Sequence, residues 1–160
     1  MRALFAALML VLIAPVAIAQ PSDPLPSEAG GPYARFALIS TQLPPEARSL
    51  MAIQSEIYAD RKQTLILRNK LLQAAQRGDR LYAVGVGFID REGAQGLMLA
   101  RRAAMMDARR WLFYLQAWHR DPKVEILAPS KDVPGIETEK EEIFSSEKAI
   151  LVLMSAPPLD

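Results

Sequence analysis

Residues 81–89 read LYAVGVGFI, and a long helical pattern follows them over residues 96–119. The first stretch is apolar at nearly every position, which predicts a strand buried on both faces and therefore central in its sheet. The second stretch repeats apolar residues at steps of three and four, which predicts one buried helix face. That face consists of Leu97, Ala100, Ala104, Ala108, Trp111, Leu115 and Trp118. Its alanines, with Gly85 and Gly87 on the strand, allow two backbones to approach closely, so we expect the helix to pack on this strand.

The rest of the chain supplies one more helical segment and three further strand candidates. Residues 46–77 keep helical spacing, interrupted by polar residues 60–63, and predict either two helices or one bent helix. Residues 123–127 and 148–155 are apolar strand candidates, and the acidic residues 136–145 are typical of an edge strand. We therefore predict an α+β fold: a small, mainly antiparallel sheet covered on one face by the long helix, with an additional N-terminal helix or helix pair.

The opposite face of the 96–119 helix combines large apolar side chains with arginines. We call it the Met/Arg face, and it consists of Met98, Arg102, Met105, Met106, Arg109 and Phe113. One interpretation is that the 46–77 segment covers it, with the arginine stems packed and their charged ends in water. Another is a partner-binding surface, because flexible methionines, an aromatic ring and arginines are typical of adaptable interfaces. Contact with lipid or an anionic polymer is a third interpretation.

The first nineteen residues have the pattern of a signal peptide. A positively charged start precedes an apolar run over residues 3–16, and the small residues Ala17 and Ala19 occupy the positions that signal peptidase reads. Cleavage is therefore expected before Gln20. The run is shorter than the ~20 residues needed to span a bilayer. The pattern predicts export to a bacterial periplasm, and an uncleaved N-terminal membrane anchor is the alternative.

The expected mature chain consists of a proline-rich leader, residues 20–45, and a single domain, residues 46–160. The chain has 19 basic and 18 acidic residues, and cleavage removes only Arg2, so the mature protein is formally neutral. This balance gives no indication of nucleic-acid binding. The charges are nevertheless unevenly distributed: residues 97–120 hold five arginines and one aspartate, while residues 121–160 hold four lysines and nine acids. The two regions are expected to attract each other or to steer a charged partner.

The chain has no cysteine, which excludes disulfides, thiolate metal sites, iron–sulfur clusters, a cysteine nucleophile and a lipid attached to an N-terminal cysteine. Its single histidine, His119, argues against a Ser-His-Asp triad and against a multi-histidine metal site. Gly85 and Gly87 precede a helix, but position 90 is Asp, where a dinucleotide-binding fingerprint needs a third glycine. We expect no catalytic residue, no cofactor and no metal.

Two sets of carboxylates have structural explanations. Asp107 lies at the border of the buried helix face, and we expect it to pair with Arg110 or to accept a hydrogen bond from a backbone N–H. Alternation places Glu137, Glu139 and Glu141 on one face of the acidic strand. This arrangement is typical of a solvated edge that resists aggregation, and the spacing lacks the pattern of a calcium loop.

The strand and helix together resemble a known family, the "LPP-twenty" envelope lipoproteins, and the N-terminal domain of flagellar assembly protein T. The resemblance covers about residues 82–112. The strand pattern Val-Gly-x-Gly falls on Gly85 and Gly87, and the helix pattern falls on Ala103, Ala104, Asp107, Ala108, Arg110 and Leu112. The resemblance implies a non-enzymatic α+β protein of the bacterial envelope. This chain departs from the family because no lipidation cysteine follows its signal pattern.

These observations predict a periplasmic, non-catalytic protein that acts by binding another envelope protein. A periplasmic domain that binds a small ligand or hydrolyses one weakly is the first alternative. A structural component tethered to the membrane by an uncleaved N-terminal segment is the second. The sequence also leaves homo-oligomerisation open.

Overall fold

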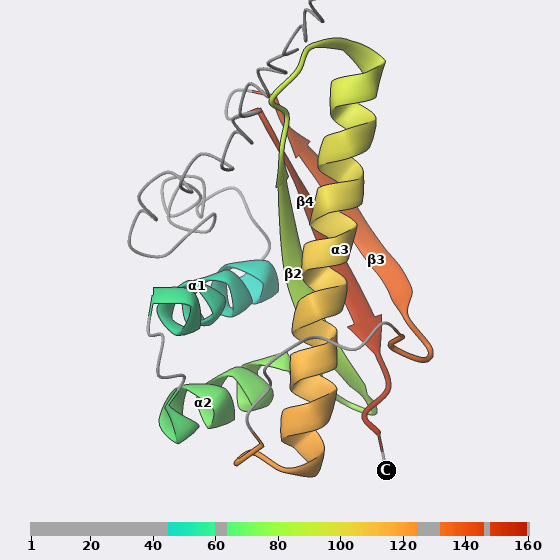
Figure 1. Ribbon diagram of the computed structural model, residues 1–160. Helices are drawn as coiled ribbons and strands as arrows, with labels where there is room; N and C mark the ends of the chain where they lie inside the picture. Colours follow the sequence, from blue (N-terminus) through green and yellow to red (C-terminus); the bar gives the residue numbers. More distant parts are fainter. Residues whose placement is uncertain (1–44, 60–63, 125–131, 146–147, 160) are drawn as a thin grey trace, which may run out of the picture.

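Two helices precede a four-stranded antiparallel sheet, and a third, long helix packs on one face of that sheet (Figure 1). The computed structural model describes residues 45–59, 64–124, 132–145 and 148–159. The elements are α1 (Pro45–Ala59), α2 (Leu65–Ala75), β1 (Gln76–Arg77), β2 (Arg80–Phe88), α3 (Gly93–Arg120), β3 (Glu137–Phe144) and β4 (Ala149–Ala156). The predicted α+β fold is confirmed, with an N-terminal helix pair.

Several expectations lie outside the described residues. They concern the signal peptide, residues 1–19, and all of the leader except Pro45, which begins α1. Of the strand candidate 123–127, residues 125–127 also lie outside, while Lys123 and Val124 belong to no strand.

The sheet has the strand order β1-β2-β4-β3, so the prediction that β2 lies inside the sheet is confirmed, although only its first two residues have β1 as a neighbour. β4 pairs with a neighbour on both sides along nearly its whole length, whereas β1 pairs only with Arg80 and Leu81 of β2. The rest of β2 is an edge, although Ala83 to Gly87 are buried. Its sequence is apolar throughout because α3 packs on one face of it and α1 and α2 also pack against it.

Side chains from α1 and α3 form hydrogen bonds with backbone groups at the open edge of β2. Gln54 of α1 forms two hydrogen bonds with Val84: its Nε2 donates to the carbonyl at 2.8 Å, and its Oε1 accepts from the N–H at 3.3 Å. Asp107 of α3 accepts from the N–H of Val86 at 3.2 Å. Unpaired backbone groups in a buried position are costly, so these side chains satisfy groups that a neighbouring strand would otherwise satisfy.

α3 can pack closely on β2 because Gly85 and Gly87 have no side chains. A Cβ on Gly85 would lie 1.9 Å from the carbonyl oxygen of Ala104, and a Cβ on Gly87 would lie 1.9 Å from that of Ala100. Ala100, Ala104 and Ala108 are all buried. The predicted close packing of the helix on this strand is confirmed.

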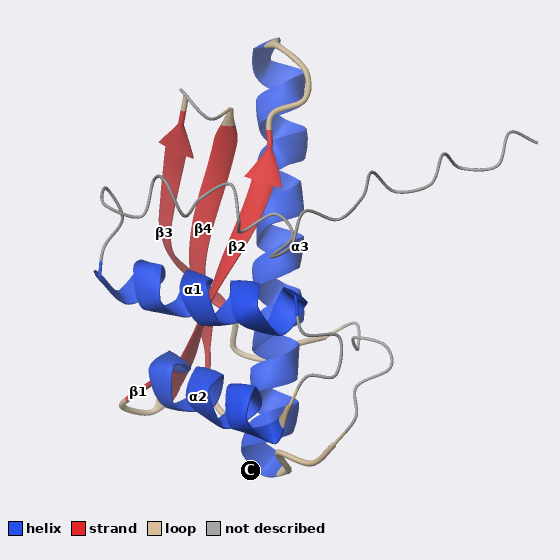
Figure 2. Ribbon diagram, turned by 90° about the vertical axis from the view of Figure 1, so that its left-hand side faces the viewer, coloured by secondary structure: helices blue, strands red, loops and turns tan. Residues whose placement is uncertain are grey.

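The 46–77 segment forms two helices and then a short strand, β1, so the predicted extension of the helix to residue 77 is wrong. The α1 and α2 helices pack against each other and against β2 (Figure 2). Thr64 accepts a hydrogen bond from the N–H of Leu67 and caps α2. Gly78, with φ of 59°, makes the turn from β1 into β2.

The α2 helix also reaches the C-terminal end of α3. The guanidinium carbon of Arg68 lies 5.2 Å from the centre of the Trp118 ring, and Nη1 donates to the carbonyls of Pro122 (3.0 Å) and Val124 (2.8 Å). Arg68 is buried, so this one side chain joins α2, α3 and the chain that leaves α3.

Candidate functional site

The Met/Arg face of α3 is open to solvent over its N-terminal half. Met98 is 59% exposed and Met106 is 62% exposed, and Arg102 and Arg109 are exposed as well. Met105 and Phe113, at the borders of the face, are half-buried. Side chains of this size normally lose most of their exposed area on folding. Met98 and Met106 are therefore two large apolar side chains left in water on the same face of α3.

The structure excludes one of the three interpretations of this face. The interpretation that the 46–77 segment covers it is wrong, because α1 and α2 lie beside the β2 edge and α2 meets α3 through Arg68 and Trp118 (Figures 1 and 2). The segment takes that position because α1 buries Leu50 and Ile57 in the core and its Gln54 bonds the β2 edge. Helical periodicity showed which residues share a face but not which face its neighbours would cover.

The arginines of α3 have two different surroundings. Arg101 forms an ion pair with Glu141 of β3 at 2.7 Å, and the hydrogen bond and charge of Glu141 raise the pKa of Arg101. Arg110 pairs with Asp107. Within the described part of the chain, Arg102 and Arg109 form no ion pair. The expected attraction between the basic helix and the acidic strand is present at Arg101. Arg102 and Arg109, on the Met/Arg face, have no carboxylate partner among the described residues.

The residues of the family pattern are placed by packing rather than by chemistry. Ala104 and Ala108 lie against Gly85, and Leu112 is buried in the core. Ala103 is exposed, so the structure shows no packing role for it. The pattern therefore reflects the packing of α3 on β2.

Asp107 makes both of the contacts expected of it. Its carboxylate pairs with Arg110 and accepts the N–H of Val86. These two contacts hold the carboxylate at the β2 edge, which supports a structural role. Gly85 and Gly87 face the α3 backbone at the distances given above, so these glycines leave no space for a nucleotide phosphate.

The acidic strand differs from its predicted arrangement. A register shift between Thr138 and Lys140 changes the alternation, so Glu137 pairs with Ser155 while Glu141 pairs with Val152. These partners lie on opposite faces of β4, and the prediction that the glutamates share one face is wrong. Glu137 forms an ion pair with Arg80 at 3.3 Å, and Glu139 accepts a hydrogen bond from Ser155. Among the described residues no three His, Cys, Asp or Glu side chains gather as a metal site. The prediction of an acidic edge strand is confirmed.

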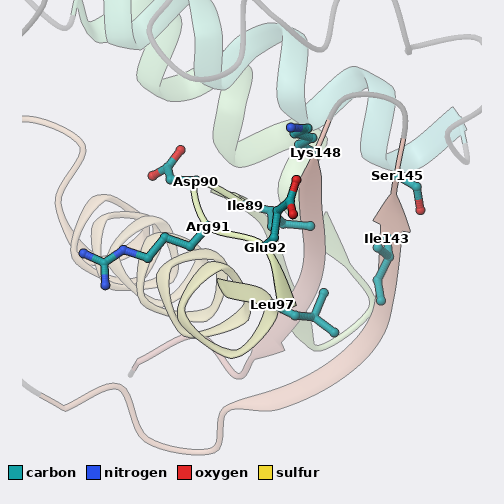
Figure 3. Close-up of a pocket in the computed structure, with 8 residues that line it drawn as sticks. All are labelled: Ile89, Asp90, Arg91, Glu92, Leu97, Ile143, Ser145 and Lys148. Atoms are coloured by element: carbon teal, nitrogen blue, oxygen red, sulfur yellow. The ribbon is translucent and has the colours of Figure 1, made fainter. Parts of the chain in front are cut away.

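A cavity of about 400 Å³ lies where the ends of β2, β3 and β4 meet the start of α3 (Figure 3). The apolar side chains at it are Ile89, Leu97 and Ile143, and the other lining residues are Asp90, Arg91, Glu92, Ser145 and Lys148. The Arg91 side chain points away from the other labelled residues. Nothing in the sequence indicates this cavity, because its two walls are about fifty residues apart and meet only through the pairing of β4 with β2 and β3.

His119 is exposed at the C-terminal end of α3, near the negative end of the helix dipole.

None of the described helices is long and apolar enough to cross a membrane. Comparison with protein-family models, curated proteins and solved structures finds no match for this chain. The candidate sites therefore rest on the geometry of the Met/Arg face and of the cavity.

Proposed function

We propose that this protein is an exported, non-catalytic component of the bacterial cell envelope that binds another protein through the Met/Arg face of α3. The observation that carries the proposal is the exposure of Met98 and Met106 beside two arginines without ion-pair partners among the described residues. Methionine adapts its shape to a partner, and arginine is enriched in interfaces.

The location and the absence of catalysis have separate support. Export is supported by the signal-peptide pattern of residues 1–19, and an envelope role by the resemblance to envelope lipoproteins. A non-catalytic role is supported by Asp107, whose carboxylate is engaged by Val86 and Arg110.

The test is cross-linked affinity capture of the tagged protein from intact bacterial cells, read by mass spectrometry. We expect one dominant envelope protein with the wild-type chain and its loss with Met106→Asp. The matched control is Ile66→Asp on α2, because Ile66 is 79% exposed and lies outside the Met/Arg face. If Met106→Asp and Ile66→Asp retain the partner equally, the face does not bind it. The same spectra show whether the chain begins at Gln20, as cleavage requires.

The cavity supports a second candidate function, the binding of a small ligand. Its volume of about 400 Å³ falls within the range of ligand sites, roughly 300–1,000 Å³, and it combines apolar and charged groups. A ligand that binds the folded state raises the melting temperature by mass action. Screening envelope metabolites by thermal shift, with Leu97→Arg as the variant that fills the cavity, tests this function. A ligand that stabilises both chains equally does not bind there.

The third candidate is a membrane-tethered component. It predicts an uncleaved N-terminus and a protein that stays in the membrane fraction after a high-salt wash. A chain that begins at Gln20 in the soluble periplasmic fraction excludes it.

A further inference from the structure

The charges of the Met/Arg face distinguish it from the rest of α3. Arg101 and Arg110 have carboxylate partners within the fold, Glu141 and Asp107. Arg102 and Arg109 are exposed and form no ion pair with any described residue. They lie seven residues apart, which places them on nearly the same line along the helix. Two unpaired guanidinium groups in register are available to bidentate partners.

We propose that this face binds an acidic amphipathic helix of another protein, laid along α3. Its carboxylates pair with Arg102 and Arg109, and its apolar side chains cover Met98, Met106 and Phe113. The face runs for about 22 Å at 1.5 Å per residue, the length of a helix of about 15 residues. This inference rests on the proposed function and specifies its partner.

A second copy of the chain fits the face less well. The pairs 98 with 113, 102 with 109 and 105 with 106 are each symmetric about the point between residues 105 and 106. An antiparallel two-fold pairing of α3 therefore sets Met98 against Phe113, which is favourable, and Arg102 against Arg109 twice, which is not. A partner with acids at the two arginine positions keeps the apolar contacts and replaces both repulsions with ion pairs.

A membrane surface also fits less well. On a helical wheel of 3.6 residues per turn, Arg102 and Arg109 lie within the arc that Met105 and Met106 bound. Helices that lie in a membrane interface keep their basic residues on the polar face and insert a separate apolar face. Insertion of the methionines into a membrane would carry Arg102 and Arg109 into the apolar layer. An acidic protein helix instead offers carboxylates at the positions of these two arginines.

The first experiment uses synthetic helical peptides of about 18 residues, long enough to cover the face. One peptide has leucines at the positions facing the methionines and glutamates seven residues apart facing the arginines, and its control has lysines in place of the glutamates. We expect the wild-type protein to bind the glutamate peptide at least about tenfold more tightly than the lysine peptide, and Arg102→Glu/Arg109→Glu to reverse this preference. Arg48→Glu, an exposed arginine on α1, is the charge control and keeps the wild-type preference.

The second experiment uses the symmetry of the face. In the two-fold pairing, Arg102 of each copy faces residue 109 of the other copy. Arg109→Glu therefore replaces both repulsions with ion pairs, and we expect this variant to dimerise in sedimentation equilibrium. The wild type and the double variant are expected to remain monomeric under the same conditions. Dimerisation of the wild type overturns the inference in favour of a second copy.

Other outcomes separate this inference from the proposed function. Failure of the wild type to prefer the glutamate peptide overturns the acidic-helix inference, as does flotation with phosphatidylglycerol vesicles without peptide binding. If Met106→Asp loses the captured envelope protein while Arg102→Glu/Arg109→Glu retains it, the inference is wrong and the proposed function stands. If neither variant loses it, both are wrong.

Discussion

Replacing Gly85 with alanine places a methyl group where the α3 backbone already lies. The added Cβ would be 1.9 Å from the carbonyl oxygen of Ala104 and 2.4 Å from the nitrogen of Ala108. Reaching ordinary van der Waals contact at 3.4 Å requires α3 to move away from β2 by about 1.5 Å. Both obstructing atoms belong to a helix backbone, so a rotamer change cannot relieve the contact.

The cost follows from the gap that this movement opens. Overpacking of a core usually costs about 1–3 kcal/mol when side chains can adjust. Here the whole helix face must separate from the sheet, and a gap of 0.5–1 Å already forfeits roughly a quarter to a half of each dispersion contact. We therefore expect Gly85→Ala to lower the free energy of unfolding by about 3 kcal/mol or more, a large part of the ~5–15 kcal/mol typical of a domain.

Equilibrium unfolding in urea, followed by the fluorescence of the two tryptophans, measures this loss. Gly78→Ala is the control, since its Cβ meets nothing within 4 Å and only its φ of 59° opposes alanine. We expect that control to cost about 1–2 kcal/mol. Adding Ala108→Gly to Gly85→Ala is the decisive variant, because it removes a side chain and leaves both backbone obstructions. A loss below about 1 kcal/mol for Gly85→Ala, or its rescue by Ala108→Gly, would refute backbone contact as the cause.

Three further changes test the edge of β2 and the link between α2 and α3. Gln54→Ala leaves the buried N–H and C=O of Val84 without their partner, and we expect a loss of about 2–3 kcal/mol in urea unfolding and faster exchange of that amide hydrogen. Asp107→Ala leaves the N–H of Val86 unbonded and is expected to cost about 1–3 kcal/mol, whereas Asp107→Asn keeps an acceptor and should cost less; equal losses would contradict the hydrogen bond as the cause. Arg68→Met keeps the buried stem but removes two charge-assisted hydrogen bonds, and we expect a melting temperature lower by several degrees, as a loss of about 2 kcal/mol implies.

The sequence was sufficient to predict the central packing of the fold. Small residues on one helix face and two glycines on the preceding strand have one simple structural explanation, and the contacts of Gly85 and Gly87 confirm it. The sequence predicts the strand at β4 for a similar reason, because eight consecutive apolar or small residues can be buried on both faces.

The open edge of β2 beyond Leu81 could not be predicted in the same way. Burial on both faces looks alike in a central strand and in an edge strand that helices cover. The decisive residue is Gln54, which is buried on α1 and lies thirty positions before Val84, the residue that it bonds. Nothing local to Gln54 or to Val84 indicates that contact. The register shift near Glu139 was hidden for the same reason, because a bulge depends on the partner strand.

The sequence of α3 predicts which residues share its surface but not which of them reach solvent. The composition of the Met/Arg face was evident, but its exposure depends on where α1 packs, and α1 packs at the β2 edge through Gln54. The cavity beside Leu97 depends on how the start of α3 and the ends of three strands come together. Long-range contacts of this kind decide which of several plausible surfaces reaches solvent.

The two faces of α3 are energetically separable, and this makes the function testable. The face against the sheet has backbone atoms in close contact, so even one methyl group at Gly85 disturbs the fold. The opposite face holds side chains that are mostly in water, and substitutions at such positions usually change stability by less than about 0.5 kcal/mol. Met106→Asp and Arg102→Glu/Arg109→Glu should therefore alter binding while leaving the unfolding midpoint close to that of the wild type. A large loss of stability in either variant would show that this face supports the fold, and it would remove the main argument for a partner.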